Sequence, residues 1–114
     1  MKVKSVLPVV FVAMLMLAAC GTKPATSDVI VATTAVTIQS YTFTPSEISI
    51  KVGETVTWTN LDSVAHNIVA DDGSWGSSQL NKGDKFSFTF NQAGSYTYHC
   101  GVHPNMIGKI IVSP

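Results

Sequence analysis

The chain has 114 residues, enough for one domain, and carries seven lysines, no arginine and seven acidic residues. This balanced charge, with neither a basic patch nor a long acidic run, excludes a typical nucleic-acid-binding protein and predicts weak long-range steering of any partner. We expect a monomer.

The N-terminus has the pattern of a secretory signal. Two lysines precede an apolar run over residues 6–19 that is too short to span a bilayer comfortably and ends in small residues. The run closes with Leu-Ala-Ala-Cys at 17–20, which resembles a bacterial lipobox. Cys20 is therefore predicted to become the first mature residue and to carry lipid. The alternative is an ordinary signal peptide that leaves Cys20 free or paired with Cys100.

The predicted cleavage divides the chain into a lipoprotein signal peptide at 1–19, a lipidated cysteine with a flexible tether at 20–34, and one folded domain at 35–114. The tether is rich in Thr, Ala and Ser, although residues 29–31 could begin a strand. Cleavage removes two lysines and leaves five against seven acidic residues, a net charge of −2. We expect an extracytoplasmic protein, lipid-anchored to a bacterial membrane on the periplasmic side or the cell surface.

Period-two alternation of apolar and polar residues dominates the domain, and no convincing amphipathic helix appears. Strands are predicted over residues 36–38, 48–52, 55–59, 86–90, 95–100 and 107–112. Residues 71–78 are the least regular and are predicted to form a surface loop, whose two aspartates solvate it rather than bind calcium. Several short strands separated by turns predict an all-β antiparallel sandwich.

The last two strands are joined by a segment rich in metal-binding side chains. Cys100, His103 and Met106 follow one another at three-residue intervals, and a lone His66 lies upstream. One thiolate, two imidazoles and a thioether form the ligand set of a blue copper site, because Cu(I) favours soft sulfur and Cu(II) favours nitrogen. A glycine and a proline interrupt any helix here, so a loop should carry three ligands while His66 arrives from another strand.

Residues 36–112 resemble a small cupredoxin, a type 1 blue copper protein. The resemblance rests on Thr-Trp-Thr-Asn at 57–60, Ala-His-Asn at 65–67, the copper loop, and Gly-Lys-Ile-Ile-Val at 108–112. Spacings of two residues between successive loop ligands are similar to amicyanin, within an amicyanin/plastocyanin-like group. The resemblance implies a Greek-key sandwich of seven to eight strands and one type 1 copper ion.

Two further residues have roles that the resemblance implies. Asn67 is expected to bond across to the loop that carries Cys100, as the residue after the first histidine does in cupredoxins, although it could be only a polar strand residue. Pro104 shapes the loop and, having no N–H, cannot donate a hydrogen bond towards the thiolate. Fewer donors to that sulfur should raise the reduction potential.

These features predict a membrane-anchored blue copper protein, not an enzyme, that carries single electrons between redox partner proteins by cycling between Cu(I) and Cu(II). The resemblance to small cupredoxins implies that electrons leave through the imidazole of His103. The alternative is an extracytoplasmic copper carrier or storage protein. An enzyme would need a second copper site. In copper nitrite reductases a histidine just before the cysteine binds a second, catalytic copper, and His99 has that position here. Such a site needs further imidazoles, however, and the chain has only three histidines, so His99 is predicted to be a strand residue.

Overall fold

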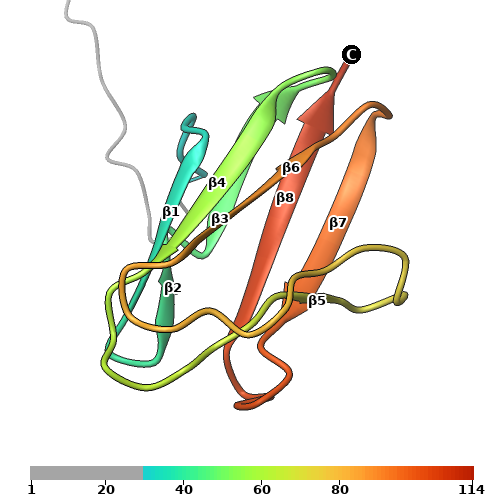
Figure 1. Cartoon of the computed structure of the whole chain (residues 1–114). Helices are drawn as coiled ribbons and strands as arrows, with labels where there is room; N and C mark the ends of the chain where they lie inside the picture. Colours follow the sequence, from blue (N-terminus) through green and yellow to red (C-terminus); the bar gives the residue numbers. More distant parts are fainter. Residues whose placement is uncertain (1–29) are drawn as a thin grey trace, which may run out of the picture.

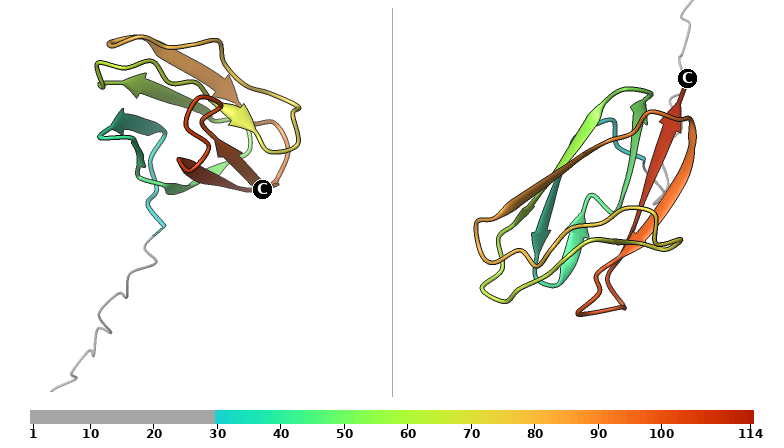
Figure 2. Two further views of the ribbon diagram at one scale, coloured as in Figure 1. Left: turned by 90° about the horizontal axis from the view of Figure 1, so that it is seen from below. Right: turned by 45° about the vertical axis from the view of Figure 1, so that its right-hand side comes forward.

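The computed structural model describes residues 30–114, which form eight strands in two layers (Figure 1). The strands are β1 (Ala35–Gln39), β2 (Thr42–Thr44), β3 (Glu47–Lys51), β4 (Thr55–Asn60), β5 (Val69–Ala70), β6 (Lys85–Thr89), β7 (Gly94–His99) and β8 (Ile107–Ser113). One sheet has the order β2-β1-β4-β6 and the other β3-β8-β7-β5. The predicted all-β sandwich is confirmed, and Figure 2 shows its layers from two further sides.

Strand pairing is mostly antiparallel, as predicted, but β1 pairs with β4 and β3 pairs with β8 in parallel. Neither parallel pair is consecutive in the chain. After β1 and β2 the chain crosses to the other sheet to form β3, and it returns to lay β4 beside β1. Parallel neighbours need such a crossover connection, whereas a tight turn suffices for antiparallel ones.

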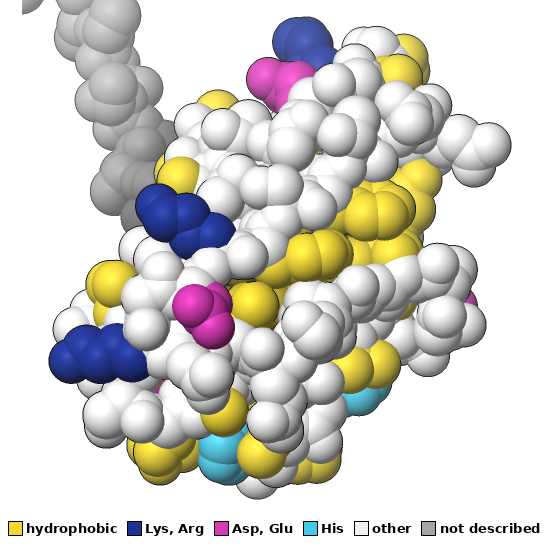
Figure 3. All heavy atoms as spheres, viewed as in Figure 1, with side chains coloured by type: hydrophobic (Ala, Val, Ile, Leu, Met, Phe, Trp, Pro, Cys, Tyr) yellow, Lys and Arg dark blue, Asp and Glu magenta, His cyan; other side chains and the backbone are white. Residues whose placement is uncertain are grey.

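The core lies between the sheets because apolar side chains occupy every second position of most strands. In β4, Val56 and Trp58 are fully buried, and in β8 Ile110 and Val112 alternate with half-exposed neighbours. Strand β6 is an edge strand, and its Phe86 and Phe88 are only partly covered. Figure 3 shows hydrophobic side chains reaching the surface on this face.

The β1–β2 turn, the β4–β5 connection and the β7–β8 connection gather at one end of the sandwich, opposite the end at which the chain terminates (Figure 1). The topology thereby brings residues near positions 40, 66 and 103 together. Cys20, the predicted signal peptide and residues 20–29 of the tether lie outside the described residues. Val31 forms a parallel bridge to Ile48, with the Ser49 N–H donating to the Val31 carbonyl at 3.0 Å. Residues 30–114 contain no helix that is long and apolar enough to cross a membrane.

Candidate metal centre

The sequence predicts that His66 lies in a strand, but the structure places it in the β4–β5 connection. It forms an isolated antiparallel bridge with Leu80, in which each backbone N–H donates to the other residue's carbonyl, at 3.1 and 2.7 Å. The pairing goes no further because the chain before His66 turns back on itself. There the Asn60 side-chain amide donates to the carbonyls of Val64 and Leu80, at 3.0 and 2.8 Å, and its Oδ1 accepts the Asp62 N–H at 2.9 Å.

The other three predicted ligands lie in the β7–β8 connection. The two strands pair as far as His99 and Ile107, and the Cys100 N–H continues the ladder by donating to the Met106 carbonyl at 3.0 Å. The Met106 N–H then donates to the His103 carbonyl at 2.9 Å. Cys100 and Met106 are therefore buried at the base of the loop, while His103 lies half-buried at its tip.

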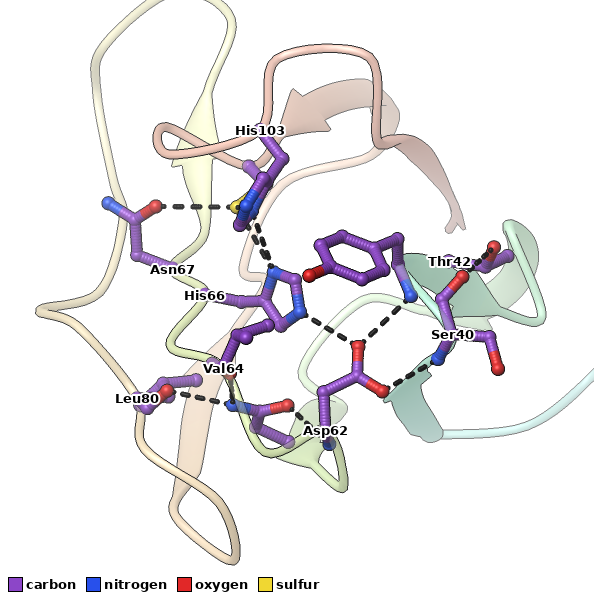
Figure 4. Close-up of polar contacts among 11 residues, drawn as sticks. Ser40, Thr42, Asp62, Val64, His66, Asn67, Leu80 and His103 are labelled. Carbon is purple, nitrogen blue, oxygen red and sulfur yellow. Dashed lines mark hydrogen bonds and ion pairs between the residues drawn. The ribbon is translucent and has the colours of Figure 1, made fainter.

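Three donor atoms from these two connections converge on one point (Figure 4). The Nδ1 atom of His66 lies 3.7 Å from the Cys100 Sγ and 3.2 Å from the His103 Nδ1, and the Sγ lies 3.9 Å from the His103 Nδ1. Cys100 and His66 are completely buried. No other group of three or more histidine, cysteine or acidic residues is placed to hold a metal ion within residues 30–114.

The spacing of these atoms fits a bound transition-metal ion. A point equidistant from the three atoms would lie about 2.1 Å from each, near the roughly 2.0–2.3 Å of zinc bonds to imidazole nitrogen and thiolate sulfur. Two imidazoles and a thiolate beside a buried methionine are the donor set of a type 1 copper centre, whereas zinc sites seldom include a thioether. The residues present therefore fit copper.

Asp62 occupies the outer side of the His66 ring. Its Oδ2 lies 2.8 Å from the His66 Nε2, the nitrogen that faces away from Cys100. Partial burial raises the pKa of Asp62, but the backbone N–H groups of Tyr41 and Ser40 and the His66 imidazole lower it by more, so the pKa lies below its ordinary value. A carboxylate can only accept hydrogen bonds, so this contact favours the tautomer with the proton on Nε2, which leaves the Nδ1 lone pair on the side of Cys100 and His103.

An aromatic side chain covers both imidazoles. The ring of Tyr41 meets the ring of His66 edge-on with centroids 5.4 Å apart, and it meets the ring of His103 in the same way at 4.9 Å. Tyr41 is itself half exposed, as are Leu61 and Val102. Hydrophobic side chains also lie beside the histidine that reaches the surface at the lower end of the molecule in Figure 3.

Asn67 connects the two loops directly. Its Oδ1 accepts the backbone N–H of Gly101 at 2.7 Å and lies 3.6 Å from the Cys100 Sγ. A Cβ atom at position 101 would lie 3.0 Å from both terminal atoms of the Asn67 side chain. The glycine after the cysteine therefore allows this close approach, and the amide shields one side of the sulfur.

His99 points away from the three converging residues, as strand alternation predicts. Its Nδ1 lies 2.7 Å from the Asp71 Oδ1 on the outer face of the sheet. The Asp71 pKa lies below its ordinary value, first because of a hydrogen bond from the Thr97 side chain and then because of His99. His99 thus belongs to a surface pair. Asp71 itself follows β5 at the start of the predicted surface loop.

Neither Asp62 nor Tyr41 has a clear signal in the sequence. The one available hint for Asp62 is that an acidic residue stands four positions before His66. Tyr41 is brought to the site by the β1–β2 turn, whose sequence lacks the asparagine or glycine that marks such turns.

Comparison with known proteins gives one consistent result. A family model described as a cupredoxin-like domain matches residues 9–112. The chain is 38% identical to amicyanin of Paracoccus versutus over an alignment of 93 positions that covers 77% of this chain and 70% of that protein. It is 35% identical to amicyanin-alpha of Methylorubrum extorquens over an alignment of 99 positions that covers 82% of this chain and 83% of that one. A third match, amicyanin of Paracoccus denitrificans, is 42% identical over 71 residues, and the alignment spans only about half of that protein, 54% of its length and 58% of this chain.

Solved structures agree with the family match. A purple cupredoxin from Nitrosopumilus maritimus superposes with a TM-score of 0.66 at 36% identity and covers 71% of this chain and 100% of that one. An oxidised amicyanin with a methionine-to-leucine substitution superposes with a TM-score of 0.67 at 34% identity and covers 69% of this chain and 80% of that one.

Proposed function

The chain belongs to the cupredoxin-like family, and from this premise we propose that it carries single electrons between redox partner proteins by means of one type 1 copper ion. The observation that carries the proposal is the convergence of two inner imidazole nitrogens and a buried thiol from separate loops. Amicyanin, to which the chain is similar, has been solved in Cu(I) forms. Copper supplies reversible one-electron cycling between Cu(I) and Cu(II).

Each proposed ligand has a distinct part. His66 and His103 offer Nδ1, Cys100 offers its thiolate, and Met106 offers a weak axial thioether. Backbone hydrogen bonds already hold Cys100, His103 and Met106 in their loop, and the bridge to Leu80 holds His66. Little of this framework has to move when the oxidation state changes, as rapid electron transfer requires.

Two neighbours complete the proposed site. Asn67 holds the cysteine loop through Gly101. Pro104 follows His103 and leaves the loop with one N–H fewer to donate towards the thiolate. His103, half-buried among exposed residues, is the proposed exit for electrons.

The closed character of the site favours an electron carrier over a copper carrier or store. His66 and Cys100 are wholly buried, the Asn67 amide lies beside the Cys100 sulfur, and the Tyr41 ring packs against both imidazoles. A protein that hands copper to another must open such a site, which the fixed loop bonds resist. Catalysis would need a second centre, and His99 is engaged with Asp71. We therefore propose no enzymatic activity.

The proposed location follows from the N-terminal sequence. Cleavage before Cys20 and lipidation of its sulfur would anchor a monomeric domain to a bacterial membrane on the extracytoplasmic side. The predicted tether begins at Cys20 and is bound to the domain from Val31, which pairs with Ile48, so its preceding part would let the domain reach partners near that surface.

A visible spectrum of the copper-loaded protein tests the function. The oxidised protein should show an intense band from thiolate-to-copper charge transfer, and Cys100→Ser should abolish the band even if copper still binds. Asn105→Ala, an exposed change in the same loop, is the matched control and should keep it. A band that survives in the serine variant would exclude the proposed centre, and a protein that exchanges copper rapidly with chelators would favour a carrier or store.

A further inference from the structure

The turn between β1 and β2 adopts an unfavourable backbone conformation at both central residues. Ser40 has φ = 56° and Tyr41 has φ = 59°, in the left-handed region that residues with a Cβ atom seldom adopt. Two-residue hairpin turns of this kind strongly prefer asparagine, aspartate or glycine. Strain of this type persists only where surrounding structure holds it, and it is frequent at functional sites.

Asp62 is the group that holds the turn. Its Oδ1 accepts the Ser40 N–H at 2.7 Å, and its Oδ2 accepts the Tyr41 N–H at 3.0 Å. The same Oδ2 lies 2.8 Å from the His66 Nε2. The Asp62 side chain is only 13% exposed, and its backbone is fixed through Asn60. Figure 4 shows the carboxylate between the turn and the His66 ring.

We propose that Asp62 is a positioning residue for the metal centre, acting on both imidazoles: it orients His66 directly, and it holds Tyr41 where its ring restrains His66 and His103. This inference rests on the proposed copper function and adds to it a residue outside the four ligands.

The direct action on His66 follows from hydrogen-bond chemistry. Because an ionised carboxylate only accepts, it fixes the Nε2–H tautomer and leaves the Nδ1 lone pair facing Cys100 and His103. A carboxylate behind a metal-bound imidazole also makes that imidazole a stronger donor. A stronger nitrogen donor and an adjacent negative charge favour Cu(II) over Cu(I), so Asp62 should lower the reduction potential.

The indirect action passes through the turn. The backbone of Tyr41 is anchored by its N–H to Asp62, and its ring lies edge-on to both imidazoles at nearly right angles, 89° in each case. His103 lies half-buried in an otherwise exposed loop, where its backbone carbonyl accepts the Met106 N–H. A fixed aromatic edge against its ring restricts rotation that the loop alone would allow.

The first test uses the metal-free wild-type protein and needs no variant. Nitrogen-15 NMR of the histidine side chains should find His66 in the Nε2–H tautomer, with a proton that exchanges slowly with water because the ring is completely buried. A predominant Nδ1–H tautomer would overturn the proposal, whether or not the protein binds copper.

The second test compares reduction potentials of copper-loaded variants. Asp62→Asn keeps the size but removes the charge and one acceptor, so the ratio of Cu(II) to Cu(I) affinity should fall at least about tenfold, a rise of 59 mV for one electron. Asp62→Glu keeps the charge and should remain within about threefold of wild type. Asp72→Asn removes an equal charge from an exposed loop aspartate, whose side chain accepts hydrogen bonds from Ser74, and should leave the potential unchanged.

The outcomes distinguish a failure of the positioning role of Asp62 from a failure of the proposed copper function. If the wild-type protein shows no charge-transfer band, the copper function fails. If the band is present but Asp62→Asn shifts the affinity ratio less than threefold and changes only the unfolding midpoint, Asp62 merely supports the turn and the positioning role is wrong. If Asp62→Asn does not fold, the potential of Asp62→Glu and the wild-type tautomer decide the question.

Discussion

The Oδ1 atom of Asn67 accepts the backbone N–H of Gly101 at 2.7 Å, so the residue after the first histidine is bonded to the residue after the cysteine. These positions are 34 residues apart in the chain. A single amide therefore fixes the distance between the two loops that supply all four proposed ligands.

Asn67→Ala should loosen this connection. Gly101 is exposed, so water can replace the lost acceptor, and the metal-free protein should lose only about 1 kcal/mol of unfolding free energy. Copper affinity should fall more, by about 10–100-fold, as is typical when a group that supports a ligand is removed. Denaturant unfolding and competition with a chelator measure the two effects, and Asn91→Ala, an exposed turn asparagine, is the control. Unchanged affinity would show that the loops hold their spacing without Asn67.

Met106→Leu tests the axial ligand. Methionine and leucine have similar volumes, so the buried side chain should be replaced at a cost below about 1.5 kcal/mol. The charge-transfer band should remain, because it arises from the thiolate. Loss of a weak Cu(II) donor should raise the potential by at least about 59 mV, equal to a tenfold change in relative affinity. Ile50→Val alters the core outside the ligand loops and should leave the potential unchanged. A potential equal to wild type in Met106→Leu would mean that the thioether does not bind the metal.

Tyr98 should make the protein sensitive to alkaline pH. Burial raises the pKa of its hydroxyl far above the ordinary value. The nearby Trp58 indole lowers this pKa by a smaller amount, because the indole N–H and the hydroxyl do not meet hydrogen-bond geometry. The unfolded chain can ionise this group near pH 10 whereas the folded chain cannot. The contribution of the buried, neutral Tyr98 hydroxyl to the free energy of unfolding is therefore fully present below about pH 10, and it is lost as the pH rises beyond that value.

Tyr98→Phe checks this expectation. Its hydroxyl has no hydrogen-bond partner within residues 30–114, so the variant should be within about 1 kcal/mol of wild type at pH 7. Above pH 10 it should lose stability less steeply than wild type. Denaturant unfolding of both metal-free proteins from pH 7 to 11 measures the difference, and identical alkaline slopes would contradict it.

Cys20 is predicted to carry the membrane anchor. Full-length protein expressed in a bacterial host should fractionate with membranes, and mass spectrometry of the mature protein should find a lipid-modified N-terminal cysteine. Cys20→Ser should block lipobox processing or release a soluble domain, whereas Ser27→Ala in the tether should have no effect. An unmodified Cys20 in the mature wild-type protein would refute lipidation without affecting the copper prediction.

The longer strands could be predicted from the sequence because their alternating residues follow the period of a sheet with one buried face. Strands β4 and β8 are found where the pattern places them. Two shorter strands, β2 and β5, have three and two residues and are too short to show a period. They exist because neighbouring strands offer them partners, which is a tertiary effect.

The four proposed metal ligands could be predicted from the sequence, whereas some of the residues that support them could not. Cys100, His103 and Met106 form a local pattern whose chemistry can be read directly, and His66 is recognised once that pattern is present. Asp62 and Tyr41 could not be found in this way, because their positions depend on a hairpin turn at Ser40 with positive φ values. Such a turn is not expected without glycine or asparagine, and only the folded chain brings the carboxylate that compensates for it.

Three of the four proposed ligands lie within seven consecutive residues, 100–106, whereas His66 precedes Cys100 by 34 positions. An unfolded or newly exported chain therefore still carries a compact set of sulfur and nitrogen donors that can capture copper before the sandwich forms. Copper then stabilises the folded state by less than the affinity of the folded protein for copper suggests. Only the difference between the copper affinities of the folded and the unfolded chain contributes to stability. His66 reaches the site only in the folded sandwich, so its bond to copper is the one that links metal binding to folding.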